Sequence, residues 1–342
     1  MTSPIEVGFA ALDAAGCEDE LVLVKAKCLL RGYVSRWTED MRHWKLRAVE
    51  QTLKSPIVNP KTGRTLRNYT FAGKVDKLVQ MPGGGHWLVD HKTTSSMDRV
   101  EDQLPILSQP MAYRMLSWAN GVQVRGAVWD MVKKPGISPK RVSQANCDLI
   151  RDTGQYYGQT VSTPGLLSSV IGCSDPVIES PELYGYRLDA DIRENSDRYF
   201  KRHIVTHSHA EMMTYLEELN DAAADINESL KRANKTGRVP YKNTAACFNF
   251  GTPCTYLGIC TGSDTPYSNT WTSGPVHPEL DDTVGLTVLT NSRLGCFATC
   301  RAKHHYRYEL GLTRDTESPA LYFGTLWHTA MDAVWSVLCE EE

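Results

Sequence analysis

The alternation of apolar and polar residues predicts a β-hairpin in the first third of the chain. Residues 71–80 alternate as a half-buried strand does, the run Met-Pro-Gly-Gly-Gly at 81–85 supplies a turn, and residues 86–90 return as a second strand. Residues 47–58 read as a further strand that leads into a turn, and residues 122–133 alternate as another. The chain is therefore expected to contain a β-sheet.

Helical periodicity predicts the elements around these strands. Residues 19–37 form one helix, and a second follows the hairpin and contains Gln109 and Tyr113. Residues 197–233 carry apolar positions at a spacing of three and four, which indicates one long helix. Another apolar-periodic helix opens at residues 323–328. This mixture of helices and strands is typical of an α/β fold.

The ends of the hairpin carry the candidate chemistry. Asp76 lies late in the first strand and Asp90 at the end of the second, so their carboxylates can share a hard divalent cation, which prefers oxygen ligands. Lys92 lies two residues beyond Asp90 and leaves the same strand face. A metal can activate water, and an ammonium can hold that water or the developing charge. The alternative is a solvated hairpin with ordinary surface charges.

Composition is that of a globular protein that stays out of membranes. The chain has 342 residues, of which 41% are hydrophobic and 23% are charged. No apolar run approaches the ~18 residues of a membrane span, and the first residues lack a secretory signal, so we expect a cytoplasmic protein. Its 10 cysteines then favour metal ligation over disulfides. A net charge of −3 leaves nucleic-acid binding open, because local basic patches set the field that a phosphate meets.

Four motifs taken together resemble a known family. They are the hairpin, the Gln109–Tyr113 helix, the run Gly324-Thr-Leu-Trp-His328, and cysteines spaced as Cys247-x6-Cys254-x5-Cys260. The combination resembles the RecB-like branch of the PD-(D/E)XK nuclease superfamily, in the form that carries a four-cysteine iron–sulfur cluster. The bacterial AddB nuclease, CRISPR adaptation nucleases and many phage exonucleases are of this type. The resemblance implies a central mixed sheet flanked by helices, with a helical region stapled by the cluster.

The resemblance also implies roles for the residues that match its motifs. Asp76, Asp90 and His328 would bind Mg²⁺ or Mn²⁺, and Lys92 would assist the attacking water. Gln109 and Tyr113 would line the side of the site that faces DNA. For His328 the alternative is a packed core residue, and for Gln109 and Tyr113 it is an ordinary polar helix face. Glu50 lies where the family often has an acid, without an assigned role.

The cysteines are expected to hold a cofactor of their own. The resemblance adds Cys300 to Cys247, Cys254 and Cys260, and four thiolates suit a [4Fe–4S] cluster. Zinc in the same four-cysteine site is the alternative, and Cys296 competes with Cys300 as the fourth ligand. The cluster would act as a structural staple, since metal-binding energy becomes folding energy.

The order of these motifs suggests a circular permutation. Residues 286–342 resemble the opening of the family, yet they follow the segment 1–262, which resembles the remainder. Residues 263–285 are rich in Ser, Thr, Pro, Gly and Asp and are expected to be a linker. Because the cluster ties both ends of the ordinary family fold together, joining them by a loop costs little entropy. The alternative is that the segments stand in an artificial order.

The resulting expectation is a divalent-metal-dependent DNA nuclease, most simply an exonuclease of recombination, repair or phage DNA processing. An endonuclease or flap-processing enzyme with the same site is the first alternative. A non-catalytic module that binds DNA ends is the second. The expected partner is DNA, as a single strand or the end of a duplex. The chain lacks the G-x-x-x-x-G-K-[S/T] motif, so unwinding would need a separate helicase or recombination partner.

Overall fold

A mixed β-sheet forms the centre of the molecule. The computed structural model describes residues 3–162, 177–249, 251–274, 276–277, 280, 286–314 and 319–340. Its main sheet has the order β1-β2-β3-β4-β7, and β11 adds to β2. The pairs β3–β4 and β11–β2 are parallel, whereas the other pairs are antiparallel. The strands are β1 (Lys45–Val58), β2 (Thr65–Gln80), β3 (His86–Thr94), β4 (Val124–Lys133), β7 (Phe200–Val205) and β11 (Thr287–Leu289).

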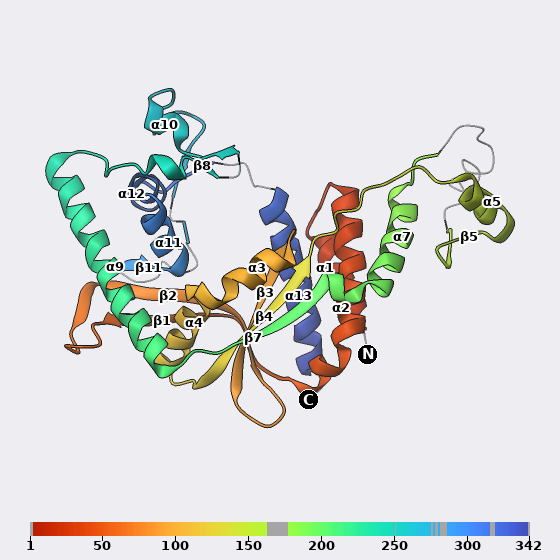
Figure 1. The fold of residues 1–342 in the computed structure, drawn as a ribbon, viewed down its shortest axis with the longest axis horizontal. Coiled ribbons are helices and arrows are strands. Elements are labelled where there is room, and N and C mark those ends of the chain that lie inside the picture. The colour runs from red at the N-terminus through yellow and green to blue at the C-terminus, as the bar shows by residue number, and fades with distance from the viewer. Residues whose placement is uncertain are drawn as a thin grey trace.

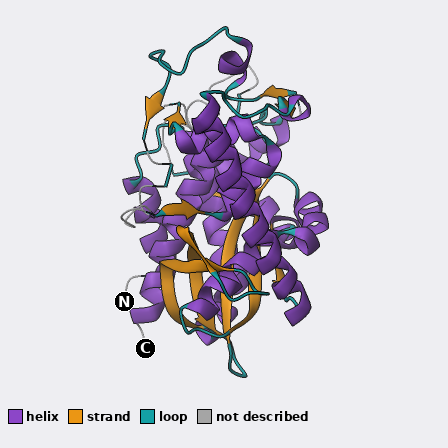
Figure 2. Cartoon of the chain, turned by 90° about the vertical axis from the view of Figure 1, so that its left-hand side faces the viewer, coloured by secondary structure: helices purple, strands orange, loops and turns teal. Residues whose placement is uncertain are grey.

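Helices cover both faces of this sheet (Figures 1 and 2). One face packs against α1, α2, α7 and α13 and the other against α4, α9 and α11, each through its own hydrophobic cluster. Within the described residues, every helix is too short or too polar to cross a lipid bilayer. The longer helices are α1 (Pro4–Ala14), α2 (Glu20–His43), α4 (Ser108–Ala119), α5 (Gln144–Thr153), α7 (Pro181–Glu194), α9 (His209–Thr236), α11 (Asn291–Thr299) and α13 (Pro319–Glu340).

Short elements complete the chain between these helices and strands. The hairpin β5–β6 lies beside α5 in an extension at one end of the molecule (Figure 1). The hairpin β8–β9 and the helices α10 and α12 surround the cysteines. The short elements are α3 (Met97–Gln103), η1 (Leu104–Ile106), β5 (Gln155–Tyr156), β6 (Gln159–Thr160), α8 (Ser196–Tyr199), η2 (Thr244–Ala246), β8 (Phe248–Asn249), β9 (Thr252–Pro253), α10 (Leu257–Thr261), β10 (Thr272–Ser273), α12 (Arg301–His304), η4 (His305–Glu309) and β12 (Leu312–Thr313).

The N-terminal and C-terminal helices pack directly against each other. Gly8 of α1 allows this approach, because an added Cβ would lie 2.9 Å from Val334 Cγ2 of α13 and 2.5 Å from Leu30 of α2. Trp327 and Trp335 of α13 are fully buried in the same cluster. The last helix of the chain is therefore part of the core around the sheet.

The structure corrects the long helix expected over residues 197–233. Only the short α8 and, later, α9 are helical there, because residues 200–205 form β7 at the edge of the sheet. Phe200 to Val205 pair antiparallel with β4, so tertiary pairing overrides the local helical pattern. The other expected strands and helices are confirmed, with ends that differ by a few residues.

The stretch 263–285 is more ordered than a plain linker in its described part. Trp271 is buried and stacks on Tyr256 with ring centroids 5.2 Å apart. The adjacent strand β10 pairs with β12. Residues 275, 278–279 and 281–285 of this stretch lie outside the described residues.

Candidate active site

Asp76 lies where two strands of the sheet separate. β2 and β3 pair from Gln80↔His86 to Lys77↔Val89, and the ladder ends there. The next residue of β2 is Asp76, whose Oδ2 accepts a hydrogen bond of 2.8 Å from the backbone N–H of His91. The carboxylate thus takes the place of a strand carbonyl and is fixed at the end of the ladder.

Glu50 faces Asp76 from the neighbouring strand. It lies between Val49 and Gln51, which pair with Lys77 and Val75, so the register places it opposite Asp76. Its φ of 50° is a left-handed conformation that few non-glycine residues adopt. Lys74 forms an ion pair with its carboxylate. Strained backbone of this kind is common at functional sites.

His328 reaches the same point from α13. Its Nδ1 lies 3.6 Å from Oδ2 of Asp76, although 252 positions (328 − 76) separate the two residues. The next turn of α13 is anchored by Asp332, whose Oδ1 lies 3.1 Å from Nζ of the fully buried Lys77. The side chain of His328 is therefore presented by a helix that is tied to β2.

Asp90 and Lys92 form an ion pair beside Asp76. Nζ of Lys92 lies 2.6 Å from Oδ2 of Asp90, whose residue is only 2% exposed. Gln109 of α4 donates a hydrogen bond of 3.3 Å to Oδ1 of Asp90 and another of 2.7 Å to the Tyr113 hydroxyl. The expected Gln109–Tyr113 face of the helix thus points at the carboxylate.

The electrostatics of this group are dominated by burial. Burial raises the pKa of Asp90 to about 7, with Lys92 opposing the rise and Asp76 adding to it. Burial alone would lower the pKa of Lys92, but the carboxylates of Asp90 and Asp76 outweigh it and raise that pKa above its usual value. Lys92 is therefore a stable cation, whereas Asp90 gains or loses its proton near neutral pH.

A cavity of about 730 Å³ gives access to this point. Its wall carries the ammonium groups of Lys134 and Lys74, the latter paired with Glu50, together with the carboxylate of Asp332. The cavity is lined by Glu50, Lys74, Thr93, Lys134, Leu321, Gly324, Thr325, His328, Thr329 and Asp332.

The donor set fits a divalent cation. One ligand atom each from Glu50, Asp76 and His328 lies within 4.8 Å of the other two. Two carboxylate oxygens and an imidazole nitrogen match the ligands that Mn²⁺ and, with more waters, Mg²⁺ accept. Asp90 lies beside this trio with its oxygens engaged by Gln109 and Lys92. The structure thus groups Glu50, to which sequence analysis assigned no role, with Asp76 and His328.

Sequence reasoning also missed the residues behind this site. His91 is fully buried, and burial holds its pKa well below the usual range. Its Nδ1 lies 3.5 Å from Oδ2 of the buried Asp130, and its ring meets that of His328 edge-on at 6.3 Å. The sequence did offer one signal for it. His91 lies between Asp90 and Lys92 in the strand, so strand alternation directs its side chain to the opposite face of the sheet.

The cysteines gather in a second place, over a small aromatic cluster. Cys254, Cys260 and Cys300 pack against Tyr256, Trp271 and Tyr306, among others. Cys247 is joined to them through the backbone, because its carbonyl accepts a 2.7 Å hydrogen bond from the N–H of Cys254. The backbone N–H of Asn243 points at Sγ of Cys300 at 3.3 Å, as N–H groups do toward thiolates in metal sites.

The two candidate cofactors require different distances between the four sulfurs. A tetrahedral zinc with Zn–S distances of about 2.3 Å holds its sulfurs roughly 3.8 Å apart. Among the described residues, no three cysteine sulfurs lie within 4.8 Å of one another. A cubane cluster, whose irons occupy separate corners, holds its four thiolates farther apart. No three of the described cysteines therefore meet the sulfur distances of a tetrahedral zinc site.

Comparisons with known proteins give a family that agrees with both the fold and the residues of the site. The family model of the PD-(D/E)XK nuclease superfamily matches residues 11–261 and 288–342. A comparison with curated proteins found no match. The family match covers the strands that carry Asp76 and Asp90 and the helix that carries His328, and it agrees with the mixed sheet flanked by helices. The chain belongs to the PD-(D/E)XK nuclease superfamily.

Proposed function

We propose that this protein is a divalent-metal-dependent exonuclease that hydrolyses phosphodiester bonds of DNA. The observation that carries the proposal is the convergence of Glu50, Asp76 and His328 within 4.8 Å, next to the Asp90–Lys92 pair. A site with three metal-binding donors and a neighbouring ammonium is equipped for hydrolysis of a phosphodiester. The open cavity beside it is lined by two lysines that suit a phosphate backbone.

The residues of the site divide the work of hydrolysis. Glu50, Asp76 and His328 would hold the cation, with Asp90 as a further oxygen ligand once it is deprotonated. When bound, Mg²⁺ or Mn²⁺ polarises the phosphodiester and lowers the pKa of water. Lys92 holds the attacking water and the charge that develops on the phosphate as the P–O bond to the leaving strand breaks. Gln109 and Tyr113 orient Asp90 and face the DNA.

End-labelled linear DNA and circular DNA of the same sequence test this assignment. With Mn²⁺ or Mg²⁺, an exonuclease releases mononucleotides or short products from the linear substrate and leaves the circle intact. Nicking or linearisation of the circle would instead establish the endonuclease or flap-processing alternative. Binding of DNA ends without any cleavage would establish the non-catalytic alternative.

We further propose that Cys247, Cys254, Cys260 and Cys300 hold a [4Fe–4S] cluster that staples the region around α10 and α12. The support is their convergence over one aromatic cluster, where Cys254, Cys300 and Cys247 lie near enough to Cys260 to add to the rise that burial causes in its pKa. Cys296 remains the competitor for the fourth position. Burial raises its pKa, with Cys300 and Cys254 near enough to contribute.

Anaerobic purification tests the cluster. We expect a brown protein with iron and sulfide in equal amounts, and bleaching in the Cys300→Ser variant. Cys296→Ser is the matched control and should keep its colour. Stoichiometric zinc without iron would favour the zinc alternative. Bleaching by Cys296→Ser, with colour kept in Cys300→Ser, would reassign the fourth ligand.

We propose that the chain is a circularly permuted member of its family, in which residues 286–342 precede 1–262 in family order. Cys300 and His328, both late in the chain, lie beside Cys254 and Asp76. The family match is interrupted between residues 261 and 288, where the linker was expected. A chain rebuilt as 286–342 followed by 1–262 should show the same metal-dependent activity. An insoluble or inactive rebuilt chain would argue against the permutation.

A partner would complete the proposed activity on duplex DNA. The chain offers the nuclease centre, whereas strand separation requires energy that this sequence shows no motif to supply. We therefore propose that it acts on single strands or frayed duplex ends, with a separate helicase or recombination protein for unwinding.

A further inference from the structure

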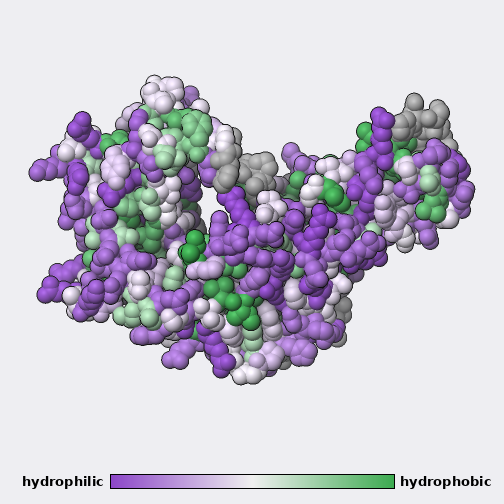
Figure 3. All heavy atoms as spheres, viewed as in Figure 1, coloured by the Kyte–Doolittle hydropathy of each residue, from purple (hydrophilic) through white to green (hydrophobic). Residues whose placement is uncertain are grey.

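A second cavity lies between α2 and α7, outside the active site. Its volume is about 450 Å³, and its floor is formed by Gly32 and the buried Ile192. Gly32 permits the close approach of the two helices, because an added Cβ would lie 2.4 Å from Cγ2 of Ile192. The molecular surface over α2 and α7 is largely hydrophilic (Figure 3). We call this cavity the arginine groove, for the side chains that surround it.

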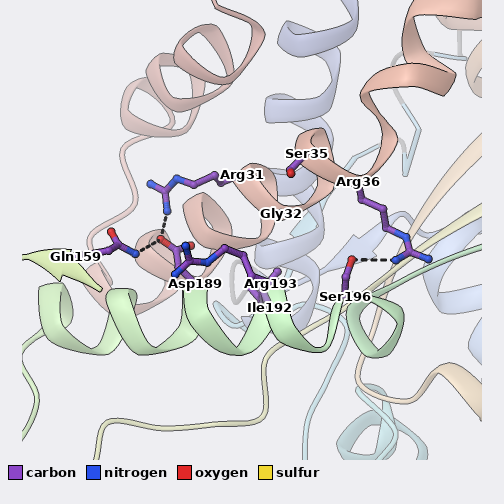
Figure 4. Close-up of a pocket in the computed structure, with 9 residues that line it drawn as sticks. All are labelled: Arg31, Gly32, Ser35, Arg36, Gln159, Asp189, Ile192, Arg193 and Ser196. Atoms are coloured by element: carbon purple, nitrogen blue, oxygen red, sulfur yellow. Dashed lines mark hydrogen bonds and ion pairs between the residues drawn. The ribbon is translucent and has the colours of Figure 1, made fainter. Parts of the chain in front are cut away.

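Three guanidinium groups and several neutral polar groups surround the floor. Figure 4 shows Arg31 and Asp189 toward one end of the groove and Arg36 with Ser196 toward the other. Arg36 donates a hydrogen bond of 2.9 Å to Oγ of Ser196, which fixes its direction. The polar lining residues are Arg31, Ser35, Arg36, Gln159, Asp189, Arg193 and Ser196.

The charges of the groove leave a cationic surplus. Asp189 is 7% exposed and is paired with Arg31, and it also accepts a hydrogen bond of 3.4 Å from Gln159. Arg36 is paired with Asp197. Arg193 is exposed, and within the described part of the chain no carboxylate forms an ion pair with it. Each arginine has five N–H donors, so the paired ones also keep donors free for an anion.

We propose that the arginine groove binds the phosphate of a nucleotide unit in a single strand of nucleic acid. A guanidinium beside serine hydroxyls is a phosphate-binding arrangement, and the apolar floor offers a surface for the sugar or base. The cavity has room for one nucleotide unit, whereas a duplex is too wide to enter between two packed helices. The inference rests on the proposed nuclease function, for which the groove would be a second contact with the substrate.

The arginine groove is connected to the active site through the packing of α2 against α13. Tyr33, on another face of α2, packs against Trp327 of α13 with ring centroids 5.5 Å apart. Trp327 is the neighbour of His328 in sequence. The groove and the catalytic cavity are therefore separated by at least one helix, roughly 10 Å thick. The proposal requires a strand of several nucleotides to pass this helix and contact both places, whereas a very short strand would reach only one.

Binding measurements with the full chain test this proposal. Fluorescence anisotropy in Ca²⁺, with single strands of about twenty and about four nucleotides, compares wild type with Arg193→Glu. We expect Arg193→Glu to weaken binding of the long strand by about tenfold and to reduce its salt dependence. Binding and Mn²⁺-dependent hydrolysis of the short strand should stay within about twofold of wild type. Arg64→Glu, an exposed arginine in the β1–β2 turn, is the charge-matched control.

Each outcome of this comparison has a defined meaning. Equal affinities of Arg193→Glu and Arg64→Glu for the long strand would overturn the proposal. A titration with dAMP tests whether the groove binds the phosphate of a free nucleotide instead of that of a strand. If Arg193→Glu abolishes binding of dAMP and leaves the long strand unaffected, the assignment to a strand is wrong. Because Ca²⁺ is used without turnover, a protein that binds DNA but never cleaves it would refute the nuclease proposal alone.

Discussion

Glu50 and Lys92 belong to different parts of the candidate site, so their loss should have different kinetic consequences. Glu50 contributes to the trio of metal donors, and Lys92 contacts Asp90 at its side. We expect Glu50→Gln to raise the Mn²⁺ concentration for half-maximal activity by about tenfold to a hundredfold, as lost metal-site groups typically do. Lys92→Gln should lower kcat by about 10²- to 10³-fold with little change in Mn²⁺ affinity, since its charge serves the transition state.

Titration of Mn²⁺ against initial rates on labelled single strands measures both constants. Lys61→Gln, an exposed lysine in the β1–β2 turn, is the control and should resemble wild type. Wild-type kinetics in either site variant would remove that residue from the proposed mechanism.

The buried carboxyl of Asp90 should make the metal-free protein sensitive to pH. Its pKa is raised to about 7 in the folded state, whereas in the unfolded chain it ionises near its ordinary value of about 3.9. Between these values the unfolded chain gives up the proton and the folded one keeps it. The protonated Asp90 therefore contributes its whole share to the free energy of unfolding below about pH 4. This contribution falls as the pH rises toward 7, by up to ~1.4 kcal/mol per pH unit.

Denaturant unfolding in EDTA from pH 5 to 8 measures this contribution. The difference in stability between wild type and Asp90→Asn should change with pH up to about 7 and become constant above it. A pH-independent difference would show that Asp90 ionises normally in the folded protein.

At the scale of elements, the contact between β2 and α4 depends on Gly73. An added Cβ there would lie 2.9 Å from Cε1 of Tyr113 and 3.0 Å from Cδ1 of Leu116. Gly73→Ala should therefore displace α4 and lower the free energy of unfolding by about 1–3 kcal/mol, as overpacking in a core does. Gly324→Ala on α13 is the matched comparison, because its Cβ would lie 3.6 Å from Oγ1 of Thr93, an ordinary contact.

Thermal unfolding of the two variants checks this contrast. We expect Gly324→Ala to leave the free energy of unfolding unchanged or to raise it by up to ~1 kcal/mol, because alanine stabilises a helix interior more than glycine does. Equal stability of both variants would show that α4 yields to the extra methyl group.

The Lys77–Asp332 pair should fix α13 on the sheet. Lys77 is fully buried and its Nζ lies 3.1 Å from Oδ1 of Asp332. Lys77→Met leaves the partly buried Asp332 without its partner, and we expect a loss of about 1–3 kcal/mol in the free energy of unfolding, because water can still solvate part of the carboxylate. The double variant Lys77→Met/Asp332→Leu should recover most of this loss, because neither charge then remains unpaired. A double variant no more stable than the single one would show that the pair itself is required.

At the scale of the whole molecule, the sequence predicts those parts of the fold that depend on neighbouring residues in the chain. The hairpin that carries Asp76 and Asp90 follows from alternation and a glycine-rich turn within about twenty residues. The α/β fold with a mixed sheet flanked by helices is confirmed. The roles of Asp76, Asp90, Lys92, His328, Gln109 and Tyr113, and of the four cysteines, stay predictions.

Long-range pairing explains what the sequence did not reveal. β7 is a strand because residues 200–205 complete the ladder of β4, and no local pattern encodes that partner. Glu50 was noted in the sequence without a role, and it joins the metal-binding group only through the β1–β2 register that places it opposite Asp76. The anchoring of His328 depends on Lys77 and Asp332, which lie 255 positions apart. Such contacts are properties of the fold rather than of any sequence window.

The central claim is that Glu50, Asp76 and His328 together hold the divalent ion on which DNA cleavage depends. Isothermal titration of Mn²⁺ into the EDTA-stripped and dialysed protein, compared with Asp76→Asn, tests it most directly. We predict a binding site in the wild type that Asp76→Asn weakens by at least about tenfold, in parallel with its loss of cleavage of labelled DNA. Equal Mn²⁺ affinities of the two proteins, or full cleavage by Asp76→Asn, would contradict the account.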